Sequence, residues 1–197
     1  KSPEETMKIW GHDKILSDVV WVIRKFRPDV IITRFPTTGE GGHGHHTASA
    51  MLAVEAFDAA ADPARFTEHF KHGVTVWQAK RILWNTFNFG GTNTQSNDQF
   101  KMDCGDYNPI LGKSYGEIAA ASRSQHKSQG FGVPAQRGSV IEYFKTIKGT
   151  APVNGLVENV VVGWKRTAEE GLAGVVNKII DKFDVSHPER SIAALVD

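Results

Sequence analysis

The chain has little of several features that mark specialised classes of protein. Its 197 residues include one cysteine, Cys104, so no disulfide can form within the chain and no thiolate cluster can bind a metal. No run of about 18 apolar residues is present, which excludes a membrane-spanning helix, and no signal peptide is visible. Any metal site must therefore be built from histidine, aspartate or glutamate.

An excess of one charge sign is also missing. The 23 lysines and arginines nearly balance the 22 aspartates and glutamates, and the net charge is +1. Such a chain offers no field that would collect nucleic acid, so we expect no nucleic-acid partner. The length and the even composition, without repeats or linkers, predict a single domain over residues 1–197.

The first elements predicted are helices. Ser2, Pro3 and Glu5 are the cap, first-turn proline and capping-box glutamate of a helix start. Apolar residues at helical spacing then predict a longer helix with one buried face, which Pro28 ends. These apolar residues are Ile15, Leu16, Val19, Val20, Ile23 and Phe26.

The rest of the pattern is mixed α/β. Residues 29–35 ("DVIITRF") predict a strand buried on both faces, as in a parallel sheet, and a helix follows from Thr47 to Asp62. Ser114, with Glu117 three residues later, predicts a helix that Gly130 closes. Further strands are predicted at 79–87, 99–103, 140–149 and 157–164, and a late helix at 168–184. This order favours a Rossmann-like α/β fold, with a mostly parallel sheet flanked by helices.

Residues 39–50 ("GEGGHGHHTASA") are the most unusual stretch. His43 and His46 form an H-x-x-H pair between a glycine-rich loop and a helix start, after a predicted strand, where ligands of α/β sheets gather. Imidazole binds a metal only when neutral, and a helix N-terminus disfavours added positive charge, so the position suits a metal ligand or a catalytic group. A solvated, histidine-rich turn is the alternative. Glu40, the nearest acid, fits a solvated loop residue.

A second polar stretch is "SRSQHKSQGFG". It contains Arg123 and His126, which suit either a binding site or an ordinary helix C-terminus, where basic residues are favoured. Asp103, Asp106 and Tyr107 suit the wall of a polar pocket, although acidic loop residues mostly face water.

Three segments, in this order, resemble the PIG-L or LmbE-like family of zinc-dependent N-acetylglucosaminyl deacetylases. They are residues 26–57, "AKRILWNTFN" and "SYGEIAAASRSQHKSQGFG". The resemblance implies an LmbE-like fold, Zn²⁺ bound by His46, and His43 as the catalytic group that stabilises the oxyanion. Arg34, Arg123 and His126 are then expected to bind an N-acetylated amino-sugar substrate.

Two departures from the family are visible. The A-H-P-D-D-type motif, which would supply another histidine, an aspartate ligand and the general base, is absent. Because the chain opens at Lys1, we expect the first strand and helix of the domain to lie in an N-terminal segment of the same protein. A tyrosine that some members place two residues before the first histidine is Gly41 here.

Two other functions stay open on the sequence. One is a catalytically inactive carbohydrate-binding or interaction domain of the same fold, and the other is a metal-buffering protein that uses His43, His45 and His46. The sugar aglycone, the oligomeric state and the compartment, whether cytoplasmic or exported, are left open.

Overall fold

A computed structural model describes residues 2–130, 132–161, 163–166 and 171–196 of the chain. The chain divides into two compact units, one formed by residues 1–102 and 142–158 and the other by residues 103–141 and 159–197. Each unit is described by itself. The single domain predicted over residues 1–197 stays a prediction.

Three helices form one side of the first unit: α1 (Pro3–Trp10), α2 (His12–Phe26) and α3 (Gly44–Ala59). The predicted start of α1 is confirmed, because the Ser2 hydroxyl accepts a hydrogen bond from the Glu5 amide at 3.2 Å. The short 3-10 helices η1 (Gly39–Gly41) and η2 (Thr67–His72) precede and follow α3.

The buried face of α2 differs from the predicted one at its end. Leu16, Val20 and Ile23 are buried as expected, but Phe26 is 78% exposed and Arg24 is only 1% exposed. The buried residues of α2 recur three to four positions apart, which is the spacing of one helix face. Arg24, four residues after Val20, completes this face. The hydrophobic pattern predicted that Phe26 is the last buried residue of this face, and that prediction is wrong.

The main sheet of the first unit has the strand order β1-β2-β8-β5. Its strands are β1 (Val30–Thr33), β2 (Arg81–Asn85), β8 (Ile141–Gly149) and β5 (Phe100–Asp103). The strands β1 and β2 are parallel, and α3 connects them, but β2 and β8 are antiparallel. The sheet is therefore mixed rather than mostly parallel, because β8 enters from a long excursion of the chain instead of a helical crossover. A short hairpin, β3 (Asn88–Phe89) with β4 (Thr92–Asn93), follows β2.

The strand β1 lies at the edge of this sheet. Within the described residues it pairs only with β2, and Ile32 is 49% exposed. The prediction that this strand is buried on both faces is wrong for the described chain. Its open edge leaves backbone N–H and C=O groups available for another strand.

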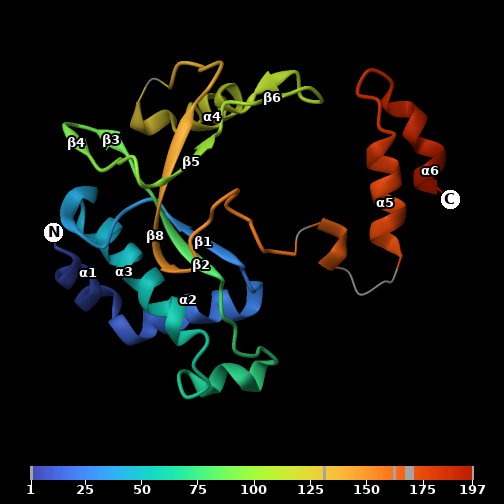
Figure 1. Ribbon diagram of the computed structural model, residues 1–197. Helices are drawn as coiled ribbons and strands as arrows, with labels where there is room; N and C mark the ends of the chain where they lie inside the picture. Colours follow the sequence, from blue (N-terminus) through green and yellow to red (C-terminus); the bar gives the residue numbers. More distant parts are fainter. Residues whose placement is uncertain (1, 131, 162, 167–170, 197) are drawn as a thin grey trace. The chain divides into compact units, whose positions relative to one another are not determined.

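The core of the first unit lies on both sides of α3. Leu52, Ala56 and Ala59 pack with Leu16 and Val20 of α2. On the side facing the sheet, Phe57 packs with Ile82 of β2. Figure 1 shows α1, α2 and α3 together beside the sheet. The helix α3 is thus held from two sides, which fixes the position of its N-terminus.

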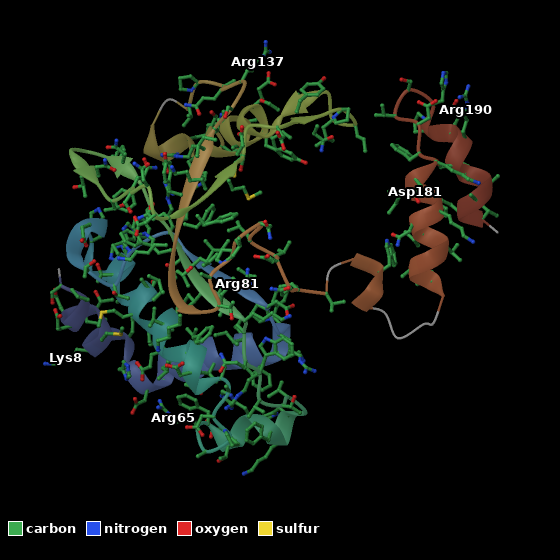
Figure 2. The ribbon with its side chains drawn as sticks, viewed as in Figure 1. Lys8, Arg65, Arg81, Arg137, Asp181 and Arg190 are labelled. Atoms are coloured by element: carbon green, nitrogen blue, oxygen red, sulfur yellow. The ribbon has the colours of Figure 1, made fainter. Side chains whose placement is uncertain are left out.

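The segment predicted as a strand at 157–164 is not one. Residues Val157 to Asn159 lie in a turn, and Val162 lies outside the described residues. The buried side chain of Arg81, labelled in Figure 2, donates to the backbone carbonyls of Leu156 at 3.0 Å and Glu158 at 2.7 Å. The Arg81 side chain therefore donates to carbonyl groups that would accept hydrogen bonds from a neighbouring strand in a sheet.

The second unit contains two short strands and three helices within its described residues. They are β6 (Tyr107–Asn108), β7 (Lys113–Ser114), α4 (Tyr115–Arg123), α5 (Leu172–Asp181) and α6 (Ile192–Val196), with single turns η3 (Lys127–Gln129), η4 (Gly163–Arg166) and η5 (Pro188–Ser191). The capping box of Ser114 and Glu117 is confirmed. The helix α4 ends at Arg123 rather than at Gly130, because Ser124 turns the chain back and accepts the Val133 amide at 3.1 Å. The predicted start of the late helix, residues 168–170, lies outside the described residues.

Among the residues described, no helix is long and apolar enough to cross a membrane.

A pH dependence of stability is expected from His12. Its Nδ1 lies 2.9 Å from Asp13 and its Nε2 lies 2.8 Å from Glu55 on α3, and hydrogen bonding to Asp13 and then to Glu55 raises the pKa of His12. Because the folded-state pKa is raised, the stabilisation is full below the unfolded pKa and is lost as pH rises through the folded pKa. The pair is partly exposed, so its contribution is at most about 1 kcal/mol.

The test is urea unfolding of Glu55→Gln at about pH 5.5 and about pH 8.5, on either side of the usual histidine pKa of about 6.5. We expect destabilisation at the lower pH and much less at the higher pH. In a His12→Gln background the pH dependence of this loss should vanish. An equal loss at both pH values would contradict the linkage.

Candidate metal and substrate site

The histidine stretch begins α3, which starts at Gly44, three residues before the predicted start at Thr47, because His43 takes the N-cap position. His43 is the N-cap residue, with extended backbone angles, and its carbonyl accepts the amides of His46 at 3.1 Å and Thr47 at 3.2 Å. His45 and His46 lie in the first helical turn. The glycine-rich loop before them forms η1, and Gly42 turns the chain with a φ of 74°. All three imidazoles are therefore presented by one rigid helix end.

The three imidazole rings lie close together. Their centroids are 5.0 Å apart for His43 and His46, 4.8 Å for His45 and His46, and 5.7 Å for His43 and His45. Within the part of the chain that the structure describes, however, no three histidine, cysteine, aspartate or glutamate side chains are placed to hold a metal ion. Proximity of the rings does not by itself make a coordination site, because the nitrogen lone pairs must converge.

His46 is held by two contacts besides those with the other imidazoles. Its Nδ1 lies 3.3 Å from the carbonyl oxygen of Gly41, and its ring stacks on Phe35 with centroids 3.9 Å apart and planes 9° apart. A carbonyl oxygen only accepts, so this hydrogen bond requires the hydrogen on Nδ1. The lone pair of neutral His46 is then on Nε2, the nitrogen that can bind a metal.

A small cavity of about 240 Å³ lies beside this imidazole. It is lined by the carboxyl end of β1 and the first turns of α3, through Ile32, Thr33, Arg34, Phe35, His46, Ser49, Ala50 and Ala53. The prediction that the histidines meet the carboxyl end of the first strand is confirmed for His46. The cavity therefore lies between the end of the edge strand β1 and the start of α3.

Arg34, predicted to bind substrate, extends from the end of β1. Its guanidinium donates to the side-chain carbonyl of Asn85, lies 3.7 Å from a carboxylate oxygen of Glu142, and lies 5.9 Å from the ring centroid of Phe87. The Trp84 indole donates to the backbone carbonyl of Arg34 at 3.3 Å. The side chain is 54% exposed, so the held guanidinium still faces solvent.

Asn85 and Glu142 were missed in the sequence. Asn85 ends β2, and its side-chain amide nitrogen Nδ2 also donates to the carboxylate of Glu142 at 2.8 Å. The signal for Asn85 was available, since polar residues at the carboxyl ends of adjacent parallel strands meet at one edge of a sheet. Glu142 gave no such signal, because the place of β8 in the sheet is a tertiary feature.

Glu40 is an exposed residue of η1, which confirms its reading as a solvated loop acid. A hydrogen bond from the Thr38 side chain is the main cause that lowers the pKa of its carboxyl group. The residue is therefore ionised over the neutral pH range.

The remaining predicted residues belong to the second unit. Arg123 is the last residue of α4, and His126 follows in the turn before η3; both side chains are exposed. Their role in substrate binding stays a prediction.

A larger cavity of about 570 Å³ also lies in the second unit. It is lined by Asp103, Gly105, Asp106, Tyr107, Gly112, Ser114, Glu117, Arg137, Gly138 and Ser139. Asp103 accepts hydrogen bonds from the amides of Gly105 and Val140, and Arg137, labelled in Figure 2, is paired with Glu117 at 2.8 Å. Asp103, Asp106 and Tyr107 all line this cavity and are all exposed, so the structure fits both readings made from the sequence.

Comparison with known proteins finds partial relatives of this chain. One, from Catenulispora acidiphila, is 35% identical over 72 residues and is named 1D-myo-inositol 2-acetamido-2-deoxy-alpha-D-glucopyranoside deacetylase 1. Proteins from Streptomyces avermitilis, 36% identical over 75 residues, and Geodermatophilus obscurus, 30% identical over 83 residues, carry the same deacetylase name without the number. All three relatives are named deacetylases.

The similarity covers a limited part of each chain. The matched segments are 36%, 37% and 41% of this chain, and they span 21%, 23% and 26% of the respective relatives. No protein-family model matches the chain, and no solved structure matches it significantly. The predicted resemblance to deacetylases of N-acetylglucosamine-type substrates is therefore supported over part of the chain.

Proposed function

We propose that this chain is part of a zinc-dependent hydrolase that removes the acetyl group from an N-acetylglucosamine-type sugar or conjugate. The observation that carries the proposal is the placement of His46 beside a cavity at the carboxyl end of β1. The names of the three partial relatives support the reaction class, because each is a deacetylase of a 2-acetamido-2-deoxy-glucopyranoside.

His46 fits the role of one metal ligand. The hydrogen bond to the Gly41 carbonyl leaves Nε2 free to coordinate, in the arrangement usual for metal-binding histidines. A zinc ion held here would lower the pKa of a bound water and would thereby supply the nucleophile at neutral pH. The described residues hold no group of three ligands, so the remaining ones must come from outside this set.

The other residues of this chain bind and orient the substrate. His43, at the N-cap of α3, is assigned to the oxyanion that forms when the acetyl carbonyl is attacked. Its imidazolium or N–H would donate to that oxygen. Arg34, held by Asn85 and Glu142, is assigned to polar groups of the sugar, which its free N–H groups can recognise. Arg123 and His126 of the second unit are proposed as further substrate contacts.

The open edge of β1 is the place proposed for the missing ligands. A parallel strand from an N-terminal segment of the same protein would satisfy the free N–H and C=O groups of this edge. Residues at the end of such a strand would then lie beside the cavity that contains His46. A histidine and two aspartates from that segment would complete the ligand set and supply the general base.

The test compares residues 1–197 alone with the protein that includes the N-terminal segment. The fragment is expected to aggregate, to lose zinc on dialysis and to release no acetate from N-acetyl sugars, because one imidazole cannot retain the metal and the edge strand is uncovered. Adding the segment should restore all three properties. A zinc-dependent rise of the melting temperature in the fragment, lost in His46→Ala, would show that the site is already complete.

The same assays separate the enzyme from the alternative of an inactive carbohydrate-binding domain. The polar cavity of the second unit favours that alternative, since it offers both carboxylates and hydroxyls to a sugar. Binding of N-acetylglucosamine by the longer protein without acetate release would support the binding domain. Acetate release that requires zinc would support the hydrolase.

A further inference from the structure

Phe35 makes an unusually close contact with the imidazole of His46. The two ring centroids are 3.9 Å apart and the ring planes differ by only 9°, so the rings lie face to face. Both residues line the cavity at the end of β1. A face-to-face contact restrains the plane of the imidazole, but a flip of the ring by 180° about the Cβ–Cγ bond would leave it in the same plane.

The Gly41 carbonyl supplies the restraint that stacking leaves open. It lies 3.3 Å from Nδ1 of His46, at the edge of the imidazole, and fixes which nitrogen points toward the η1 loop. Stacking and this hydrogen bond act along different directions. Together they define the plane of the ring and which of its two edges faces the Gly41 carbonyl.

The absence of a side chain at Gly41 belongs to the same arrangement. A Cβ atom at this position would lie 3.1 Å from Cδ1 of Phe35 and 3.6 Å from Cβ of His46. The first distance is shorter than an ordinary van der Waals contact, so a side chain here would press on the Phe35 ring. Glycine at this position therefore leaves the space that the stacked ring occupies.

We infer that Phe35 is a positioning residue for His46: with the Gly41 carbonyl, it holds the imidazole in the Nδ1–H tautomer and presents Nε2 for metal binding. This inference rests on the proposed function for the identity of the bound group. The orientation and the tautomer themselves are properties of the metal-free chain. Partners that orient a metal-binding histidine typically change metal affinity by about 10–100-fold when they are removed.

The experiment uses the full-length protein after zinc has been removed by chelation. Nitrogen-15 NMR of the His46 side chain, at a pH where the imidazole is neutral, is expected to show the Nδ1–H tautomer. The Phe35 ring current should shift the His46 ring protons upfield. In Phe35→Leu, this shift should disappear and the tautomers should mix, whereas Phe35→Tyr should retain both signatures.

Two further variants separate positioning from general loss of packing. Gly41→Ala leaves Phe35 in place but crowds it, so it should weaken the ring-current shift without creating a cavity. Phe87→Leu removes a ring that contacts Trp84, and it should leave the His46 signals unchanged. Zinc affinity, measured by competition with a chelating dye, should fall about 10–100-fold in Phe35→Leu and stay near wild type in Phe35→Tyr and Phe87→Leu.

An Nε2–H tautomer in the wild type, or His46 signals unchanged by Phe35→Leu, would overturn the inference. Unchanged zinc affinity in Phe35→Leu would also overturn it. Failure of the wild type to release acetate would instead refute the proposed function, because the tautomer and ring-current measurements need neither substrate nor metal.

Discussion

In the full-length protein, His46→Ala is expected to abolish zinc retention, whereas His45→Ala should retain the metal. Both residues lie in the first turn of α3, but only His46 combines the hydrogen bond to Gly41, the stack on Phe35 and a place in the wall of the cavity. His45 is exposed and is not among the residues that line this cavity. Removing one of three protein ligands leaves too few for stable binding.

His43→Ala is the matched third variant. It should keep zinc and lower the rate by roughly 10²–10³-fold, as expected for the loss of one oxyanion donor. Metal content after dialysis and acetate release are the two measurements. Equal loss of metal in His45→Ala and His46→Ala would show that the H-x-x-H register is wrong. Loss of metal in His43→Ala would move that residue from the catalytic role to the ligand set.

Arg24→Leu is expected to unfold the first unit or destabilise it severely. The buried guanidinium donates to five backbone carbonyls in the segment that ends α3 and leads to η2. These acceptors are Ala59, Ala60, Asp62, Arg65 and Phe66, at 2.8 to 3.2 Å. Three of these carbonyls, those of Ala60, Asp62 and Phe66, also accept the backbone amides of Trp77, Arg65 and His69, so Arg24 is a second donor there. For Ala59, the last residue of α3, Arg24 supplies a donor that the helix itself does not.

The size of the effect follows from how many acceptors are left without a donor. Burial lowers the pKa of Arg24, which nonetheless remains charged because arginine titrates far above neutral pH. Leaving one buried acceptor unsatisfied costs about 1–3 kcal/mol, so loss of the donor at the Ala59 and Arg65 carbonyls should cost about 2–6 kcal/mol. Arg24→Lys should recover only part of the lost unfolding free energy, since lysine lacks the planar set of five donors.

Urea unfolding measures these differences, and Lys25→Met serves as the control. Lys25 is the next residue of α2 but is exposed, so its replacement should change the unfolding free energy by less than about 0.5 kcal/mol. A similarly small change in Arg24→Leu would show that the five hydrogen bonds contribute little.

Much of the local structure could be predicted from the sequence. The caps at Ser2 and Ser114, the end of α2 before Pro28 and the start of α3 at the histidine stretch all depend on neighbouring residues. Interactions of this kind act within about one helical turn, so the order of residues is sufficient to reveal them. The glycine-rich loop followed by H-x-x-H could be placed for the same reason.

The sequence-based prediction was wrong where a partner far along the chain changes the burial or the secondary structure that a residue type usually has. Arg24 reads as a surface residue, and its burial follows only from carbonyls brought to it by α3 and the loop after it. The segment 157–164 reads as a strand, but Arg81 binds the carbonyl of Glu158 within it and that of Leu156 just before it. In both cases a buried guanidinium satisfies backbone groups far away in the chain, which no local pattern records.

For the candidate site, the sequence by itself determined which side chains are available: imidazoles at a helix start behind a strand, and no cluster of cysteines. Only the tertiary structure decided which imidazole is oriented, because Phe35 and Gly41 reach His46 through the path of the loop between β1 and α3. It also placed Asn85 and Glu142 around Arg34 and left β1 at the sheet edge. The physical reason is that residue type sets what a side chain can donate or accept, whereas its partners depend on which strands become neighbours.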